Sequence, residues 1–427
     1  MLDASLSTQI MSAVDEKFDE QVSVLADLVR IPSTRYREAP AQDMMARLFK
    51  AESLSVDRWQ IHVEDLKHLP GFSPKHQDYD DAWNVVGSWR PNSPKGRSLI
   101  LNGHIDVVPE GPHEMWTVAP PFEPRIKDGW LHGRGSGDMK AGLVLNHYAL
   151  IALKRLGWRP AAEVYQQSVV EEECTGNGAL ACLQRGYRAD AALIPEPSDG
   201  TLTIAQVGVM WFQVKVTGHP VHVYKADAGS NAIESAYRLI QALRALEKDW
   251  NARKGVDPHF HDHRHPVNFN VGKIAGGDWA SSVPAWCTFD MRVGVLPSMT
   301  LAEARREVEA CVRQAAAGDA FLGNSPPTVT WEGFQAEPFV LKNHEQARGV
   351  LAGAHQAVFG ETLLDKTSTG TADNRFFGLY AGIPALVYGP KSDDIHGFDE
   401  RVELESVRRI TQATALFVAE WCGLERV

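Results

Sequence analysis

The sequence predicts an α/β protein in which helices cover a layered sheet and a second, smaller α+β unit is inserted into the chain. Short apolar runs of strand length alternate along the chain with longer segments of helical periodicity, which is typical of such layered sheets. This texture changes around Gln206 and resumes with a helical segment from Asn343. The chain of 427 residues also exceeds what one hydrophobic core usually spans, so two units are expected.

The individual elements follow from the spacing of apolar residues. A first helix is expected where such residues recur at helical spacing from Ile10 to Leu28, and Pro32 should end it. The other elements expected in the first unit are helices over 41–52, 140–156, 178–185 and 343–359 and strands over 98–102, 163–170, 189–194 and 385–388. The insert should contain helices over 231–250 and 301–316 and strands over 210–216, 265–271, 285–293 and 328–331. We therefore expect a first unit formed by residues 1–207 and 335–427, and an inserted unit formed by residues 208–334.

Composition and charge exclude several classes of protein. The net charge is -11 and no long Lys/Arg run occurs, so a nucleic-acid partner is not expected. No apolar run reaches the roughly 20 residues of a membrane span, and residues 1–20 carry acidic side chains where a secretory signal is basic and apolar. We therefore expect a cytoplasmic protein without a membrane partner. The five cysteines form no Cys-x-x-Cys pair, which argues against a disulfide framework and against a cysteine zinc site.

Polar side chains stand at the end of a predicted strand and after a glycine-rich turn. An apolar run ends in His104, and Asp106 lies two residues later on the same side of the chain. Asp106 is the candidate acceptor for the second ring N–H of a metal-bound His104, although a His-x-Asp pair also occurs in ordinary turns. Asp138 follows a run with three glycines and precedes a helix. It could cap that helix, or it could bridge two metal ions with its two oxygens.

More carboxylates follow at two further strand ends. Glu171, Glu172 and Glu173 are consecutive; they would form a charged loop if solvated, whereas a divalent cation would offset their repulsion. Glu196 stands between two prolines, where an exposed turn is the alternative, and His396 follows a strand and turn. Sites in open α/β sheets form beyond the carboxyl ends of the strands. We therefore predict one metal site formed by His104, Asp138, the acids of residues 171–173, Glu196 and His396.

The ligand types indicate the metal and the chemistry. Imidazole and carboxylate ligands without a thiolate favour Zn²⁺, with Co²⁺ or Mn²⁺ as substitutes. Two ions roughly 3.5 Å apart would polarise a carbonyl group and lower the pKa of a shared water. A nearby carboxylate that is not a ligand would take the proton of that water and pass it to a leaving amine.

Five strings resemble, in their order, the M20 family of zinc metallopeptidases and deacylases, which includes acetylornithine deacetylase, succinyl-diaminopimelate desuccinylase, aminoacylase and glutamate carboxypeptidase. The strings are NGHIDVVP, GRGSGDMKAG, VVEEECTGNGA, PEP and DIHGFDE, and they span nearly the whole chain. The resemblance implies two zinc ions per subunit, with His104 and Glu196 on one, Glu173 and His396 on the other, Asp138 bridging, and Glu172 as general base. It also implies a zinc-binding α/β domain interrupted by an α+β lid that often forms a homodimer interface.

Further strings resemble substrate-side motifs of this family. The string GHPVH resembles the start of the lid motif, whose histidine often comes from the second subunit and helps to stabilise the oxyanion. Here that residue is His222, unless it is a surface histidine, and Asn231 lies in the same motif. Arg292, in an Asp-x-Arg string, would bind a substrate carboxylate through a bidentate pair or form a structural salt bridge. Gly370 and Thr371 belong to the string GTADNR, which resembles the family's substrate-side loop.

The resemblance implies hydrolysis of an amide, in which Glu172 deprotonates a water and zinc and His222 hold the oxyanion. An N-acyl amino acid or related N-acylated amine, as in acetylornithine deacetylase, is the favoured small-molecule substrate. A dipeptidase or carboxypeptidase, or a deformylase of an N-formylaminopyrimidine, would use the same ligands. A metal-holding binding protein without catalysis is the alternative of a different class, and the presence of Glu172 beside the five ligands argues against it.

Overall fold

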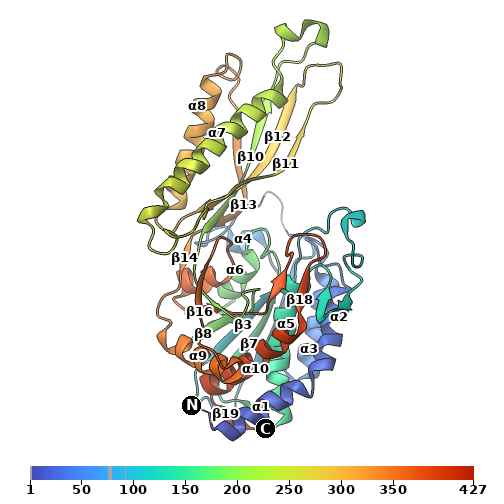
Figure 1. Ribbon diagram of the computed structural model, residues 1–427, viewed down its shortest axis with the longest axis vertical. Helices are drawn as coiled ribbons and strands as arrows, with labels where there is room; N and C mark the ends of the chain where they lie inside the picture. Colours follow the sequence, from blue (N-terminus) through green and yellow to red (C-terminus); the bar gives the residue numbers. More distant parts are fainter. Residues whose placement is uncertain (1, 76–78, 92) are drawn as a thin grey trace.

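The computed structural model describes residues 2–75, 79–91 and 93–427. Segment 208–336 forms an elongated lid above a larger body formed by the rest of the chain (Figure 1). Within the described residues, the body is built on a nine-stranded sheet with the order β1-β2-β7-β3-β8-β16-β9-β14, and β15 pairs with β9. These strands are β1 (Ser55–Gln60), β2 (Trp83–Trp89), β3 (Leu99–His104), β7 (Val164–Val169), β8 (Ala191–Ile194), β9 (Leu202–Gln206), β14 (Phe339–Val340), β15 (Asp365–Ser368) and β16 (Ala385–Val387). The predicted α/β class is confirmed.

The centre of this sheet is parallel. β3 pairs in parallel with β7 on one side and with β8 on the other, and β16 pairs in parallel with β8. All residues of β3, β7 and β8 are buried, because side chains on both faces pack into hydrophobic cores. Ile100 packs into one core, and Leu99 and Leu101 pack into the other. The carboxyl ends of these three strands therefore meet at one edge of the sheet.

Helices supply the two cores. The helices of the body are α1 (Ala4–Asp15), α2 (Phe18–Val29), α3 (Ala39–Ala51), α4 (Val63–Leu66), α5 (Ala141–Arg155), α6 (Asn177–Gln184), α9 (Glu345–Phe359) and α10 (Leu404–Cys422). α3 and α6 contribute to the core that contains Ile100, and α9 and α10 contribute to the core that contains Leu101. α5 contributes to both. The long C-terminal helix α10 contacts α1, α5 and α9 and thereby ties the two ends of the chain together.

The first helical segment differs from the expectation of one continuous helix. It is divided into α1 and α2 by a break at Glu16 and Lys17. α1 packs against α10 and α5, and α2 packs against α5 and the turn that carries Asp138. The apolar spacing runs on through the break and does not signal it.

Shorter elements complete the described part of the body. They are β4 (Arg125–Lys127), β5 (Trp130–His132), β17 (Ser392–Asp393) and β18 (Arg401–Glu403), which form a small sheet, β6 (Trp158–Pro160) and β19 (Leu424–Arg426), which pair together, and the short helical segments η1 (His113–Met115), η2 (Ser136–Lys140) and η5 (Phe376–Tyr380). No helix in the described part of the chain is long and apolar enough to cross a membrane. The cytoplasmic location stays a prediction.

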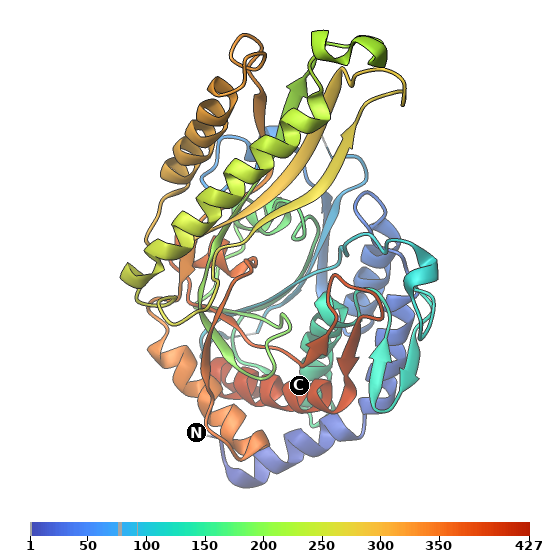
Figure 2. The same ribbon diagram turned by 45° about the horizontal axis from the view of Figure 1, so that its top comes forward.

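The lid contains a second sheet with one covered face. Its antiparallel strands follow the order β11-β12-β10-β13, with β10 (Gly208–Thr217), β11 (Phe269–Gly276), β12 (Trp286–Val295) and β13 (Thr328–Ala336). Helices α7 (Ala232–Ala252) and α8 (Leu301–Ala317) lie side by side on one face (Figure 2). Phe212, Val214 and Val216 are buried in the core beneath these helices, while the intervening residues are exposed. This α+β arrangement agrees with the predicted insert, and the boundaries at 207/208 and 334/335 stay a prediction.

One strand of the lid begins later than expected. The predicted strand over 265–271 is wrong in its first half, because β11 starts at Phe269. Residues before it bond to α7 instead: the side chain of Asn251 accepts from Val267 N and donates to Val267 O, and His265 contacts Glu247. These helix side chains take the hydrogen bonds that a strand partner would otherwise make.

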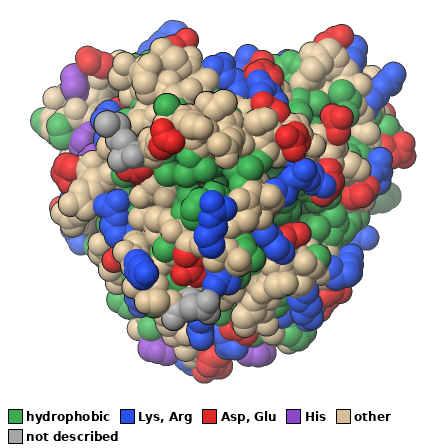
Figure 3. Space-filling model, turned by 90° about the horizontal axis from the view of Figure 1, so that it is seen from below, with side chains coloured by type: hydrophobic (Ala, Val, Ile, Leu, Met, Phe, Trp, Pro, Cys, Tyr) green, Lys and Arg blue, Asp and Glu red, His purple; other side chains and the backbone are tan. Residues whose placement is uncertain are grey.

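An apolar groove lies at the opposite end of the body from the lid. It has a cavity volume of about 710 Å³ and is lined by residues of α1, α9 and α10, together with Arg97 just before β3. Figure 3 shows this lower face, with hydrophobic side chains near its centre among charged ones. Because β3 runs from this end to His104, the groove and the carboxyl edge of the sheet lie at opposite ends of the same strand.

Candidate metal centre and active site

The carboxyl ends of the parallel strands carry the predicted ligands. His104 is the last residue of β3, Glu173 follows β7, and Glu196 follows β8. Since these strands are parallel neighbours, their exits lie next to one another. Side chains from separate strand ends therefore lie together at this edge of the sheet, and their role as metal ligands stays a prediction.

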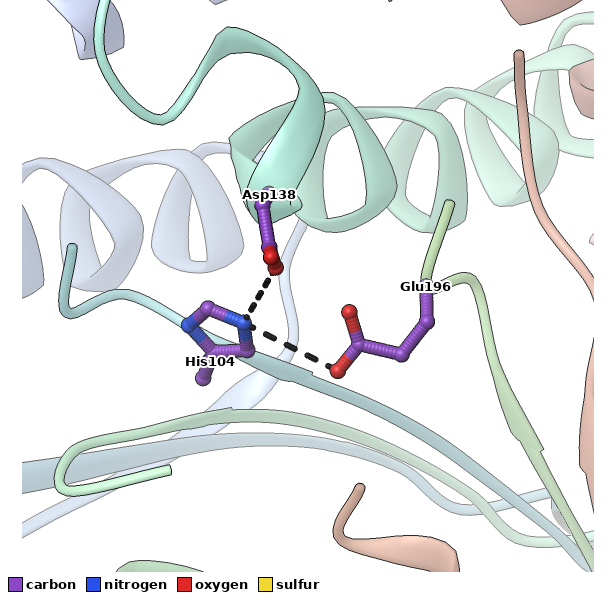
Figure 4. A group of neighbouring side chains, drawn as sticks. All are labelled: His104, Asp138 and Glu196. Atoms are coloured by element: carbon purple, nitrogen blue, oxygen red, sulfur yellow. Dashed lines mark hydrogen bonds and ion pairs between the residues drawn. The ribbon is translucent and has the colours of Figure 1, made fainter. Parts of the chain in front are cut away.

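The first group of side chains consists of His104, Asp138 and Glu196 (Figure 4). His104 Nε2 lies 3.1 Å from Asp138 Oδ1 and 3.7 Å from Glu196 Oε1. The other ring nitrogen, Nδ1, lies 2.8 Å from the backbone oxygen of Asp106. That contact orients the ring and leaves Nε2 facing the two carboxylates.

The second group shares Asp138 with the first and adds Glu173 and His396. His396 Nε2 lies 3.4 Å from Asp138 Oδ2 and 3.0 Å from Glu173 Oε2. His396 stands with positive φ in the loop between β17 and β18. Each oxygen of Asp138 therefore faces a different histidine, as a bridging carboxylate requires.

Asp138 does not cap the following helix, which was the alternative for this residue. The N-cap of α5 is Lys140, and the backbone of Asp138 is extended, with φ -119° and ψ 98°. The extended backbone, together with Gly135 and Gly137 before it, turns the carboxylate toward the two histidines. The peptide bond between Asp138 and Met139 is cis.

The donor set fits divalent cations. In each group the ligand atoms lie within 4.8 Å of one another, and they are imidazole nitrogens and carboxylate oxygens, the donors that Zn²⁺, Co²⁺ and Mn²⁺ accept. Glu172, Glu173 and Glu196 bring further negative charge to this edge, and like charges at such distances repel. A divalent cation in each group would offset that repulsion.

The electrostatics of the two histidines reflect the surrounding carboxylates. Glu173 and Asp138 raise the pKa of His396 to about 11, against the opposing effect of burial. Burial also lowers the pKa of His104, but Glu196, Asp138 and Glu172 outweigh it, so the net pKa lies well above its usual value. The carboxylates around each imidazole thus favour positive charge at this edge of the sheet, which a bound cation would supply.

Glu172 lies beside the first group without belonging to it. Its Oε2 is 4.0 Å from His104 Nε2, and its side chain is 8 % exposed. Burial, with Glu196 and Asp373 as further contributors, raises the pKa of Glu172 well above its usual value, against the opposing charge of His104. A carboxylate with a raised pKa accepts a proton more readily, which suits a general base.

The predicted role of Asp106 needs a correction. The acceptor for His104 Nδ1 is the backbone oxygen of Asp106, whereas its carboxylate lies 3.7 Å from that nitrogen. The carboxylate instead accepts from the backbone N–H groups of Glu172, at 3.3 Å, and Glu173, at 3.1 Å. Asp106 therefore orients His104 and also holds the turn that carries the next two acids.

A buried ion pair near Asp138 was not predicted from the sequence. Arg134 Nη1 lies 2.6 Å from Glu400 Oε2, and both side chains are almost completely buried. Glu400 Oε1 accepts from Gly137 N and Asp138 N, and Arg134 Nη2 donates to Gly397 O. The pair ties the loop of Asp138 to the loop of His396. Both residues lie within the family-like strings, and this was the available signal.

The sequence matches a known family over most of its length. A sequence model of peptidase family M20/M25/M40 matches residues 100–420. The chain belongs to this family. It is accordingly a metal-dependent hydrolase that acts on amide bonds.

Relatives of this M20 enzyme include proteins named for two different amides. The chain is 29% identical over 449 residues to the N-formyl-4-amino-5-aminomethyl-2-methylpyrimidine deformylase of Halalkalibacterium halodurans, covering 100% of both chains. It is 28% identical to the protein of the same name from Bacillus subtilis, covering 98% of each. It is 26% identical to the succinyl-diaminopimelate desuccinylase of Bradyrhizobium diazoefficiens, covering 95% of this chain and 100% of that one.

Solved structures of other proteins share the fold. The dipeptidase Dug1p from Saccharomyces cerevisiae superposes with a TM-score of 0.76 at 15% identity, covering 97% of this chain and 98% of that one. Human carnosine dipeptidase 1 gives a TM-score of 0.75 at 15% identity, covering 97% and 99%. At such identities the likeness concerns the fold alone.

Arg292 connects the lid of this M20 enzyme to the loop that follows β15. Its Nη2 donates to the backbone oxygen of Thr369 at 2.9 Å, and burial lowers the pKa of its guanidinium. Asp290, the carboxylate of the same string, accepts from Gln213 instead. The salt bridge considered as the alternative for Arg292 is thus not formed with Asp290, and the guanidinium stands next to the loop of Gly370 and Thr371.

That loop carries several buried polar atoms without a hydrogen-bond partner among the described residues. They are Thr371 Oγ1, both carboxylate oxygens of Asp373 and both side-chain polar atoms of Asn374. Asp373 is 1 % exposed. Buried groups of this kind are usually paired in folded proteins, so the loop has hydrogen-bonding capacity to offer a ligand. Asp373 and Asn374 were not among the predicted site residues.

The remaining predicted residues, His222 and Asn231, lie on the lid. His222 is exposed, its Nδ1 accepts from Tyr224 N, and its backbone bridges to Ser282. The short helix η3 (Val223–Ala228) that follows it lies at the end of the lid farthest from the body (Figure 1). Asn231 caps α7 by accepting from Ile233 N and Glu234 N. One subunit therefore does not bring these two residues to the metal groups, and their proposed contacts with substrate stay predictions.

Proposed function

We propose that this protein is a two-metal-ion deacylase that releases an amine from an N-acylated small molecule, with an N-formylated aminopyrimidine as its first candidate substrate. The observation that carries this choice is the match to two deformylases of that substrate over 100% and 98% of this chain. Matches of this extent support a shared arrangement of the chain around the site. The N-formyl group is also the smallest acyl group that such a site has to admit.

The two groups of side chains supply the proposed ligands. His104 and Glu196 would hold one Zn²⁺, Glu173 and His396 the other, and Asp138 both, with Co²⁺ or Mn²⁺ as possible substitutes. When bound, the ions polarise the amide carbonyl and lower the pKa of water. Glu172, through Oε2, takes the proton of the attacking water and delivers it to the nitrogen of the leaving amine. Asp106 keeps His104 oriented and the turn of Glu172 in place.

We further propose that the active form is a homodimer through the lid. His222 lies far from the metal groups of its own subunit, so its predicted role at the oxyanion requires a second copy. The lid offers a surface for one: β11 is an edge strand of its sheet, and Tyr237, Ile274 and Trp279 are exposed at 62 %, 56 % and 74 %. Exposed apolar side chains beside a free strand edge are typical of subunit interfaces.

A second candidate substrate is an N-acyl amino acid, as in acetylornithine deacetylase or the desuccinylase relative. The observation that favours it is Arg292, whose guanidinium is largely buried and bonds to a backbone oxygen. A carboxylate of the substrate could pair with the remaining N–H groups of Arg292 in a bidentate fashion. A dipeptide or a carboxypeptidase substrate would present the same carboxylate. An aminopyrimidine has none, so Arg292 separates the two proposals.

The test is amine release by zinc- or cobalt-loaded protein from an N-formylaminopyrimidine, N-formyl, N-acetyl and N-succinyl amino acids, and dipeptides. Preference for the pyrimidine supports the first proposal, whereas preference for acylated amino acids or dipeptides replaces it by the second. An Arg292→Met variant should lose turnover of the carboxylate substrates and keep that of the pyrimidine. If metal-loaded protein cleaves nothing in the panel, both proposals fail and a metal-holding binding protein takes their place.

A further inference from the structure

Arg35 makes a bidentate ion pair beneath the turn that carries Glu172 and Glu173. Its Nε donates to Glu171 Oε1 at 2.5 Å, and its Nη2 donates to Glu171 Oε2 at 2.8 Å. The side chain of Glu171 is 1 % exposed. Two parallel hydrogen bonds between a guanidinium and a carboxylate fix both distance and orientation, so the position of Glu171 is closely coupled to that of Arg35.

Glu171 is also the point from which the turn is built. Its backbone has a φ of 68°, in the left-handed region. Its backbone oxygen accepts from Cys174 N, Thr175 N and Gly176 N, and its carboxylate accepts from Thr175 Oγ1. Left-handed φ is unfavourable for a residue with a long side chain, so the surrounding contacts must hold it. The direction in which Glu172 and Glu173 leave the strand depends on this residue.

The segment that carries Arg35 is itself attached to the exit of β3. Val107 N donates to Ser33 O, and Ser33 Oγ donates to Ile105 O. Thr34 bridges to Val107 in parallel. The backbone that positions Arg35 is thus bonded to the loop that follows His104, and the side chain of Arg35 is bonded to the turn that precedes Glu173. One short segment contacts both loops.

Charge explains why an arginine stands there. Glu171 is followed directly by Glu172 and Glu173, and the carboxylate of Asp106 accepts from the backbone of both. A cation paired with Glu171 offsets part of the repulsion among these neighbouring acids.

We propose that Arg35 is a positioning residue: by pairing with Glu171 it holds the turn that presents Glu172 as general base and Glu173 as metal ligand. The inference rests on the proposed roles of those two acids. Arg35 acts on one side of the turn, through the Glu171 side chain, while Asp106 acts on the other, through the backbone N–H groups of Glu172 and Glu173. Residues that orient metal ligands in this way typically affect metal affinity or activity by about 10- to 100-fold.

The test uses Arg35→Met, Arg35→Lys, Glu171→Gln and the double variant Arg35→Met/Glu171→Gln in the full chain. Arg35→Met should lower kcat by about 10- to 100-fold with little change in KM, and it should alter the visible absorption spectrum of the cobalt-loaded protein, because the ligand Glu173 moves. Arg35→Lys keeps the charge but not the paired hydrogen bonds, so it should recover part of kcat. The kcat of the double variant should be no lower than that of the less active single variant, since both residues act through one contact.

A matched control separates positioning from general destabilisation. Arg185 forms a similar bidentate pair with Asp57, at 2.6 and 2.9 Å, between the end of α6 and β1. Arg185→Met should leave the cobalt spectrum and kcat unchanged.

Three results would overturn the inference. The first is a cobalt spectrum of Arg35→Met that is identical to that of the unmutated protein. The second is a change of Arg35→Met that is confined to KM. The third is a loss of kcat in the double variant that equals the product of the two single losses. If Arg35→Met does not fold, Arg35→Lys and Glu171→Gln carry the same comparison. If the unmutated protein cleaves no substrate, the proposed function fails by itself, and the spectra still decide whether Arg35 positions the metal ligand.

Discussion

The buried carboxylate of Glu400 accepts a hydrogen bond from the backbone N–H of Asp138, at 3.1 Å. Its other oxygen pairs with Arg134 at 2.6 Å. The carboxylate proposed to bridge two metal ions is therefore held through its own backbone by a residue that the chain reaches much later. This contact predicts that the site and the stability of the body depend on the same ion pair.

Glu400→Gln should lower the free energy of unfolding by about 3 kcal/mol, because it leaves the Arg134 guanidinium buried without a charge partner. It should also weaken zinc binding, since the loop of Asp138 loses a strong acceptor. Urea unfolding and a zinc titration measure the two effects. Glu405→Gln, which removes an exposed partner of Arg408, is the control and should cost at most about 1 kcal/mol. Equal losses in the two variants would contradict the prediction.

Glu172→Gln should retain its metal and lose turnover by about 10²- to 10⁴-fold, because the amide cannot accept a proton from water while the ligands are unchanged. Metal content measured by atomic absorption, together with initial rates on the best substrate of the panel, tests this. A variant that stayed fully active would show that another residue is the base.

Asp138→Ala should weaken binding of both zinc ions, whereas His396→Ala should weaken that of only one, because only Asp138 faces both groups. Zinc bound per chain after dialysis distinguishes the two variants. His113→Ala removes an exposed histidine and should leave the zinc content unchanged. The bridging role would be wrong if Asp138→Ala and His396→Ala lost the same single ion.

His222→Ala and Glu172→Gln subunits should each be inactive alone and should regain activity when mixed. A mixed dimer would contain one site with an intact Glu172 and an intact His222 from the other subunit. Rates after mixing, with each variant alone at the same total concentration as the control, measure this exchange. Lack of recovery, with mixed dimers demonstrated by a tag on one variant, would count against sharing of His222 across subunits.

The burial of His147 should make the stability of the fold decrease at acid pH. It is buried beside Phe49 and Tyr148, and its Nδ1 donates to Gln166 Oε1. Burial lowers its pKa from 6.5 to about 4. As the pH falls from 6.5 to 4, the unfolded chain binds a proton at this position and the folded chain does not, so stability decreases in this window.

His147→Gln removes that titration. When the pH is lowered from 7 to 4.5, the free energy of unfolding of the unmutated protein should decrease by about 2 kcal/mol more than that of the His147→Gln variant. Urea unfolding at a series of pH values measures both curves. Parallel curves would show that His147 is not buried in its neutral form.

The match between prediction and structure differs from element to element for physical reasons. The strands that lead to His104, Glu173 and Glu196 are short, begin with apolar residues and are followed by turns, so local pattern was enough to place them. The break between α1 and α2 lacks such a signal, because apolar spacing continues through it, while in the structure α1 packs on α10 and α5 and α2 packs on α5 and the turn of Asp138. The strand β2, which lies beside β7 in the sheet, was not predicted.

The sequence by itself determined the class of the fold and the residue types of the metal groups, because apolar periodicity and the placement of acids and histidines at strand ends are local properties. Only the tertiary structure decided which atoms face one another. It brought Asp138 between His104 and His396, turned the carboxylate of Asp106 toward the turn of Glu172, and placed Arg35 and Glu400 beneath the ligand loops. These contacts join residues far apart in the chain, and their geometry depends on strand order and helix packing.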